Sequence, residues 1–157
     1  MKISYIGIGS NLGDRRKNIK RAISLLRKDK KIKFLRSSKI YETKPIGPPQ
    51  RKFLNGVLKI KTDYSPLDLL RKLKNIEHIL GRRKTSLRWG PRCIDLDILF
   101  YNKLILNTKE LTIPHPEIPK RFFVLKPLNE ISPLFKHPLL KKTIKELLRN
   151  YEDNKKH

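Results

Sequence analysis

The order in which strand-like and helix-like segments follow one another is the feature that most constrains this fold. Apolar residues recur at helical spacing in two segments, 15–28 and 65–81. Short segments rich in β-branched and aromatic residues precede, separate and follow these helices, at 2–9, 32–43, 53–63 and 93–101. This order predicts a ferredoxin-like β-α-β-β-α-β fold of the α+β class, in which an antiparallel sheet carries helices on one face.

The second helix has the most clearly marked ends of any expected element. Ser65 is a natural N-cap, Pro66 stands at the first helical position, Asp68 favours the first turn, and Gly81 ends the helix. The other expected elements are a proline-rich loop, a basic loop, short helical turns and a final amphipathic helix, at 44–50, 82–92, 117–127 and 139–150.

The strand expected at 53–63 alternates in polarity. Val57, Lys59 and Lys61 are expected to face away from the side that carries Leu58 and Ile60. This alternation predicts another strand of the sheet.

The length and the apolar pattern indicate one globular domain over 1–157. No stretch approaches the ~20 apolar residues of a membrane span, and the N-terminal segment turns polar too early for a secretory signal. The single cysteine, Cys93, excludes an intramolecular disulfide and fits a reducing compartment. We therefore expect a cytoplasmic protein without membrane contact, and a monomer.

The chain is strongly basic, with 38 Lys and Arg residues against 14 Asp and Glu residues and a net charge of +24. Such a charge raises the possibility of a polyanionic partner. The lysines, however, are spread from Lys2 to Lys156 rather than gathered in one block. A lysine-rich solvated surface is therefore favoured, no specific nucleic-acid partner is expected, and nucleic-acid binding remains the second hypothesis.

Two of the scarce carboxylates, Asp95 and Asp97, stand inside the apolar run CIDLDILFY. Because alternate residues of a strand share a face, both are expected to point the same way, with Cys93 and Leu99. The core-facing side would then carry Ile94, Leu96, Ile98 and Phe100. A solvated face is the alternative, but this chain uses lysine for solvated charge. Paired carboxylates on one rigid strand favour a Mg²⁺ site.

Two further segments carry possible phosphate chemistry. The segment GIGSNLG is glycine-rich, but its glycines at 7, 9 and 13 do not fit the dinucleotide-binding spacing, and a plain turn is favoured over a ligand-binding one. Arginine offers planar, bidentate recognition of phosphate. Four arginines lie within eleven residues just before the aspartate pair, at Arg82, Arg83, Arg88 and Arg92.

The segment RWGPRCIDLDIL closely resembles the most characteristic segment of the 6-hydroxymethyl-7,8-dihydropterin pyrophosphokinases of the folate pathway. The resemblance extends along the chain through YIGIGSNLGD, YETKPIGPP, FLNGV, LTIPHP and RFFVLKPL. It implies a ferredoxin-like fold and transfer of the β,γ-diphosphoryl group of ATP to the hydroxymethyl oxygen of the pterin, with release of AMP. ATP would be the co-substrate, and two Mg²⁺ ions would be bound by Asp95 and Asp97.

The same resemblance implies roles for individual positions. The catalytic residues would be Arg82, Arg92, Asp95 and Asp97. The residues at the nucleotide would be Leu70, Glu77, Arg82, Arg88, Trp89, Arg92, Ile98, Thr112, His115 and Arg121. The pterin would stack between Phe53 and Phe123, near Thr43, Pro45, Ile46, Asn55, Trp89 and Asp95. Trp89 would move with a loop that closes over both substrates.

Some positions depart from the family pattern, and other functions remain open. The departures are Phe53, Lys84, Glu110 and Pro116, which stand where the family often has tyrosine, arginine, arginine and tyrosine. No general base is evident, so the aspartates are expected to act mainly through metal. One alternative is a basic ferredoxin-like RNA-binding domain, although this sequence has no RNP1-like segment. The other alternative is an inactive family member that serves as a partner subunit.

Overall fold

The computed structural model describes residues 1–44, 49–81 and 93–155. Its main sheet holds five strands: β1 (Lys2–Ser10), β2 (Ile32–Ser37), β3 (Tyr41–Thr43), β4 (Phe53–Thr62) and β5 (Asp95–Tyr101). The strand order is β2-β4-β1-β5, with β3 also paired to β4, and every pairing is antiparallel. With α1 (Arg15–Lys28) and α2 (Pro66–Ile79) as the two crossovers, the expected ferredoxin-like order is confirmed.

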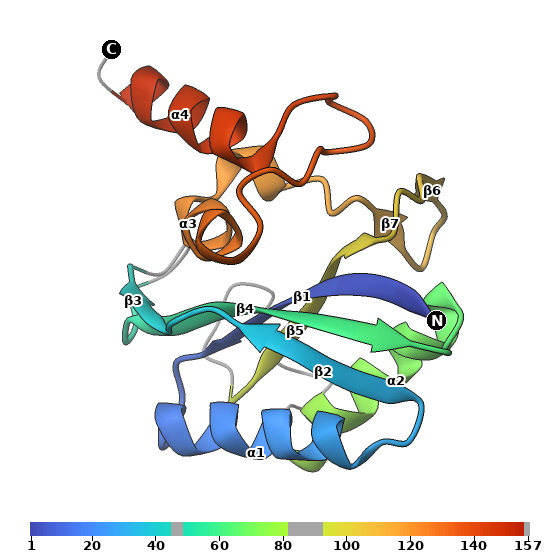
Figure 1. Ribbon diagram of the computed structural model, residues 1–157. Helices are drawn as coiled ribbons and strands as arrows, with labels where there is room; N and C mark the ends of the chain where they lie inside the picture. The colour runs from blue at the N-terminus through green and yellow to red at the C-terminus, as the bar shows by residue number, and fades with distance from the viewer. Residues whose placement is uncertain (45–48, 82–92, 156–157) are drawn as a thin grey trace.

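Helices cover both faces of the sheet, so the expectation of helices on one face was wrong. In Figure 1, α1 and α2 lie below the sheet, whereas α3 (Phe122–Ile131) and α4 (Ile144–Lys155) lie above it. The remaining elements are β6 (Leu106–Asn107), β7 (Thr112–Ile113) and the 3₁₀ turn η1 (Ile118–Lys120). The turns expected at 117–127 are thus η1 and the first half of α3. The last helix begins at Ile144 rather than at residue 139.

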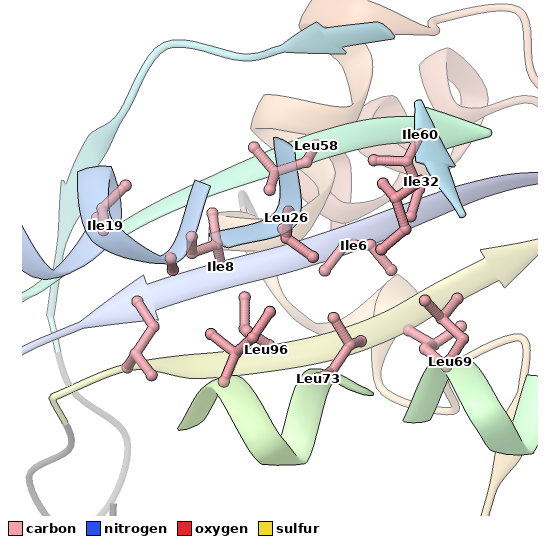
Figure 2. Close-up of a cluster of buried hydrophobic side chains, with 14 of the residues drawn as sticks. Ile6, Ile8, Ile19, Leu26, Ile32, Leu58, Ile60, Leu69, Leu73 and Leu96 are labelled. Atoms are coloured by element: carbon pink, nitrogen blue, oxygen red, sulfur yellow. The ribbon is translucent and has the colours of Figure 1, made fainter. Parts of the chain in front are cut away.

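The first hydrophobic core lies between the sheet and the helices α1 and α2. Figure 2 shows side chains from both helices and from several strands that meet in this layer. The labelled residues of this core are Ile6, Ile8, Ile19, Leu26, Ile32, Leu58, Ile60, Leu69, Leu73 and Leu96, all of them at most 6% exposed.

A second core lies between the sheet and α3 and α4, and it corrects two expectations from strand alternation. Val57, expected to face solvent, is fully buried beside Leu125. The register of β1 and β5 shifts so that Tyr5 pairs with Phe100 while Ile6 pairs with Ile98. The extra residue in β5 lets Leu99 and Phe100 both enter the second core, whereas Phe100 had been expected in the first core.

A buried carboxylate fastens the end of α1 to the start of α2. Asp29, whose side chain is 8% exposed, accepts hydrogen bonds from the Tyr64 hydroxyl (2.6 Å) and the Lys31 amide (2.8 Å). The Lys72 ammonium lies 3.2 Å away. Burial raises the pKa of Asp29, but the hydrogen bonds from these three groups outweigh it and hold the pKa below the ordinary value.

We expect Asp29→Asn to lower the free energy of unfolding at pH 7 by about 2 kcal/mol, because an amide cannot replace all three contacts. Since the folded pKa is depressed, the stabilisation is present above the unfolded value near 3.8 and is lost as the pH falls through the folded pKa. Urea unfolding at pH 7 and at pH 3 measures this difference. Asp68→Asn is the control, because Asp68 and Arg71 form an exposed pair. Equal losses in the two variants would contradict the expectation.

Candidate functional site

The centre of the candidate site is a pair of glycines inside β1. On one side Gly7 and Gly9 pair with Asp97 and Asp95, and on the other side Gly9 pairs with Asn55. Directly opposed residues of an antiparallel pair point to the same face. The two carboxylates therefore share the face of α3 and α4 with Asn55, and bare backbone separates them. At a strand spacing of about 4.8 Å, Asp95 and Asn55 lie about 10 Å apart.

The two glycines do not form the turn that the sequence favoured. Both lie within β1, and the turn comes later, at Gly13, which has φ of +70°. A Cβ atom at Gly9 would stand 2.7 Å from Asn55 Oδ1 and 3.5 Å from a ring carbon of Phe53, whereas one at Gly7 would stand 3.5 Å from Leu99. Gly9 therefore allows the side chain of Asn55 to occupy this face.

One wall of the site comes from β3 and β4. Asn55, which is 9% exposed, donates a hydrogen bond from Nδ2 to Thr43 Oγ1 at 2.5 Å. Thr43 in turn pairs with Phe53, whose side chain is half-buried. Three residues of the predicted pterin set are thus neighbours on one surface. An amide fixed by a threonine beside an aromatic ring can bind the polar edge of a flat heterocycle while the ring stacks on its face.

A second wall follows β7. The His115 amide donates to Leu99 O at 3.0 Å, which places the backbone of His115 next to β5. Burial and the neighbouring Arg121 lower the pKa of His115, and Glu117 and Asp95 oppose that shift. His115 is therefore neutral at pH 7. Because its Nδ1 accepts from the Glu117 amide (3.2 Å), its proton sits on Nε2, where it can be donated to a phosphate oxygen.

Arg121 completes this wall. Its guanidinium lies 5.6 Å from the centre of the Phe123 ring and contributes to the electrostatic environment of His115. The structure thus brings His115 and Arg121 close to the aspartate face, with Phe123 beside them at the start of α3. This arrangement can hold a polyphosphate next to an aromatic surface.

Three residues of the predicted nucleotide set belong to the other side of β5. Leu70 and Glu77 lie on α2, and Ile98 is 3% exposed within the first core. Figure 1 shows α2 on the face of the sheet away from α3. Glu77, which is 6% exposed, accepts a hydrogen bond from the Leu96 amide at 2.8 Å, between the two aspartates. Thr112, another residue of the predicted nucleotide set, lies in β7 and is half-buried. Their nucleotide contacts remain predictions.

The aspartate pair suits a metal ion that takes only one or two ligands from the protein and the rest from water and substrate. Within residues 1–44, 49–81 and 93–155, no group of three or more His, Cys, Asp or Glu side chains is arranged to hold a metal ion. Asp95 and Asp97 are nevertheless a suitable donor set for Mg²⁺, which binds through one or two carboxylates and fills its shell with water and substrate phosphates. The remaining predicted site residues lie outside the described residues: Pro45, Ile46, Arg82, Arg83, Lys84, Arg88, Trp89 and Arg92.

Sequence reasoning missed a group that holds the segment before β4. Asn11 is 1% exposed, and its Nδ2 donates to Gln50 Oε1 (2.7 Å) and to Arg51 O (3.1 Å). Arg51 donates back to Gly13 O at 2.9 Å. The signal was present in the segment SNLG, because asparagine commonly bonds to backbone near a turn. These bonds tie the start of the Phe53 wall to the end of β1.

The comparisons with known proteins agree with this geometry. The sequence model of the family described as 7,8-dihydro-6-hydroxymethylpterin-pyrophosphokinase (HPPK) matches residues 5–133. The 2-amino-4-hydroxy-6-hydroxymethyldihydropteridine pyrophosphokinases of Bacillus subtilis and Aquifex aeolicus are each 45% identical to this chain. The first match covers 82% of this chain and 77% of that protein, and the second covers 93% and 90%.

Longer proteins also match. The folic acid synthesis protein fol1 of Schizosaccharomyces pombe is 46% identical over 94% of this chain, which spans 20% of that protein. A crystal structure of Plasmodium falciparum HPPK-DHPS has a TM-score of 0.79 at 20% identity, covering 99% of this chain and 45% of that one, and it supports the fold.

In the part of the chain that the structure describes, no helix is long and apolar enough to cross a membrane. The chain belongs to the HPPK family.

Proposed function

We propose that this chain transfers the diphosphoryl group of ATP to the hydroxymethyl oxygen of 6-hydroxymethyl-7,8-dihydropterin. The observation that carries the proposal is the sharing of one sheet face by Asp95, Asp97 and Asn55, with His115 and Arg121 beside them. Phosphate-binding groups and a wall suited to a flat heterocycle are therefore about 10 Å apart, at two strand spacings. That separation suits a reaction that joins a pterin to a diphosphate.

The reaction balances as a simple displacement. The pterin hydroxyl oxygen attacks the β-phosphorus of ATP, the bond from that phosphorus to the bridging oxygen of the α-phosphate breaks, and AMP leaves. The hydroxyl proton passes to solvent. A loose transition state requires correct positioning of the two substrates and neutralisation of the phosphate charge more than it requires a strong base.

Each part of the site has a role in that displacement. Asn55 would fix the polar edge of the pterin, and Phe53 and Phe123 would stack on its two faces. Neutral His115 would donate from Nε2 to a phosphate oxygen, and Arg121 would add positive charge. Asp95 and Asp97 would hold Mg²⁺, which supplies neutralisation of the phosphate charge when bound. Arg82, Arg88, Arg92 and Trp89 would act from the segment between α2 and β5.

Release of AMP tests the proposal. The purified chain is incubated with ATP, Mg²⁺ and the reduced pterin, and the nucleotides and pterins are separated. We expect AMP and pterin diphosphate in equal amounts, and no AMP when the pterin lacks its hydroxymethyl group. Formation of ADP, or AMP release that does not depend on the pterin, would overturn the proposal. Size-exclusion chromatography of the same purified protein tests the prediction that it is a monomer.

The RNA-binding alternative has less support. RNA-recognition motifs of this topology stack bases on an open face of the sheet. Here α1 and α2 cover one face and α3 and α4 cover the other (Figure 1). An RNA affinity that falls steeply with salt, in a chain that releases no AMP, would favour the alternative.

A further inference from the structure

We propose that Glu130 is a positioning residue that sets the affinity for the pterin, by holding β3 against the last turn of α3. This inference rests on the proposed function. It concerns a carboxylate outside the predicted site set.

Glu130 holds the bend between β2 and β3 at two points. The Lys39 amide lies 3.2 Å from Oε1 and 2.9 Å from Oε2, and the Tyr41 hydroxyl donates to Oε1 at 2.5 Å. The hydrogen bond from Tyr41 and its burial raise the pKa of the tyrosine to about 12. The hydroxyl therefore stays protonated near neutral pH and remains a hydrogen-bond donor.

The strand that Glu130 holds carries part of the pterin wall. β3 has only three residues, and in the described part of the sheet it pairs with β4 alone. Such a short strand depends on contacts outside the sheet for its position. Tyr41 pairs with Asn55, and two residues later Thr43 accepts the hydrogen bond from Asn55 Nδ2. A shift of β3 therefore turns the amide that is proposed to bind the pterin.

The other end of the same helix carries the opposite wall. Phe123 lies in the first turn of α3 and Glu130 in the last, separated by seven residues or about 10 Å of helix. The same helix, which contains Pro127 between these two residues, thus presents Phe123 and also holds the strand that orients Asn55. This geometry points to Glu130 as the contact that keeps the two walls at a fixed separation.

The start of the bend has a separate attachment. Ser38 Oγ accepts from the Val57 amide at 2.9 Å, and the Ser38 amide donates to Val57 O at 2.9 Å. Loss of Glu130 should therefore release β3 while β2 stays paired to β4. The consequence is a local change at Thr43 and Asn55 rather than unfolding of the sheet.

The experiment compares Glu130→Ala and Tyr41→Phe with Glu146→Ala. Glu146 is a matched control, because it also accepts from an amide and a hydroxyl, those of Thr143 (3.1 and 3.0 Å), but at the start of α4. Binding of the reduced pterin to the complex with Mg²⁺ and a non-hydrolysable ATP analogue is measured by calorimetry. All proteins are kept at least about 15 °C below their melting temperatures, so that every variant is folded during the titration.

We expect the pterin Kd to rise about tenfold in Glu130→Ala and about threefold or more in Tyr41→Phe, as for loss of hydrogen bonds to a charged group. Glu146→Ala should lower the melting temperature but leave the pterin Kd within twofold of wild type. The Kd of the ATP analogue should be unchanged in all three. The double variant Glu130→Ala/Tyr41→Phe should resemble Glu130→Ala alone, because Glu130→Ala already removes the contact with the Tyr41 hydroxyl.

Wild-type pterin affinity in both Glu130→Ala and Tyr41→Phe would overturn the positioning role. Equal weakening in Glu146→Ala, or equal weakening of the ATP analogue, would also overturn it, since a general loss of stability would then explain the result. If Glu130→Ala fails to fold, Tyr41→Phe and the calorimetry decide the question. A wild-type chain that binds no pterin would refute the proposed function itself, and that result is distinct from variants that match a wild type that binds.

Discussion

Replacement of Asp97 by alanine is expected to lower turnover at least about 10³-fold at saturating Mg²⁺ and substrates. Asp97 and Asp95 are the paired carboxylates of the candidate site, both on the face beside His115 and Arg121. If the proposed function is right, removal of one carboxylate would take away a ligand of the Mg²⁺ that neutralises the phosphate charge. The effect should appear mainly in kcat, because the charge to be neutralised develops in the transition state. AMP release, followed as Mg²⁺ is raised from 0.1 to about 50 mM, is the measurement.

A matched control separates this role from a general effect of lost negative charge on so basic a chain. Asp63 is an exposed aspartate whose carboxylate lies 3.9 Å from the N-terminal ammonium, at the opposite end of the sheet. Asp63→Ala removes the same charge and should leave kcat within about twofold. Near-normal turnover of Asp97→Ala at saturating Mg²⁺ would refute the assignment.

The parts of this fold that follow from local pattern could be predicted from the sequence. Helix α1 runs from Arg15 to Lys28, as its apolar spacing predicted. The N-cap at Ser65 is present, with its hydroxyl accepting from the Asp68 amide. Asp95 and Asp97 share a face because strand alternation holds up to Ile98. Each of these features depends on residues within one element, so one segment of sequence contains the whole cause.

Features that depend on a partner element could not be predicted in this way. Phe100 enters the second core because the register of β5 against β1 shifts after Ile98, and nothing within CIDLDILFY marks that position. Val57 is buried because α3 and α4 cover a face that the ferredoxin-like order leaves open. Glu130 acts on Lys39 and Tyr41, about ninety residues earlier in the chain. Conversely, the aspartate pair was recognisable because carboxylates are scarce here.

Gly9→Ala should raise the pterin Kd about a hundredfold, whereas Gly7→Ala should change it less than about threefold. The new Cβ at position 9 would stand 2.7 Å from Asn55 Oδ1, closer than real Cβ contacts allow, and 3.5 Å from Phe53. Asn55 has little room to give way, since it is 9% exposed and bonded to Thr43. At position 7 the three atoms nearest to the methyl group all belong to the Leu99 side chain, the nearest at an ordinary contact distance of 3.5 Å.

The pair of glycine variants distinguishes a steric effect in the pterin wall from a general effect of glycine on the strand. Both changes remove backbone freedom from the unfolded chain, which by itself stabilises a protein by about 0.4–1 kcal/mol. Only Gly9→Ala adds a clash, so its melting temperature should fall below that of Gly7→Ala. Calorimetric titration of the pterin, and separately of the ATP analogue, measures the effect, and the ATP affinity of Gly9→Ala should be unchanged. Equal pterin affinities in the two variants would show that the face around Asn55 does not bind the pterin.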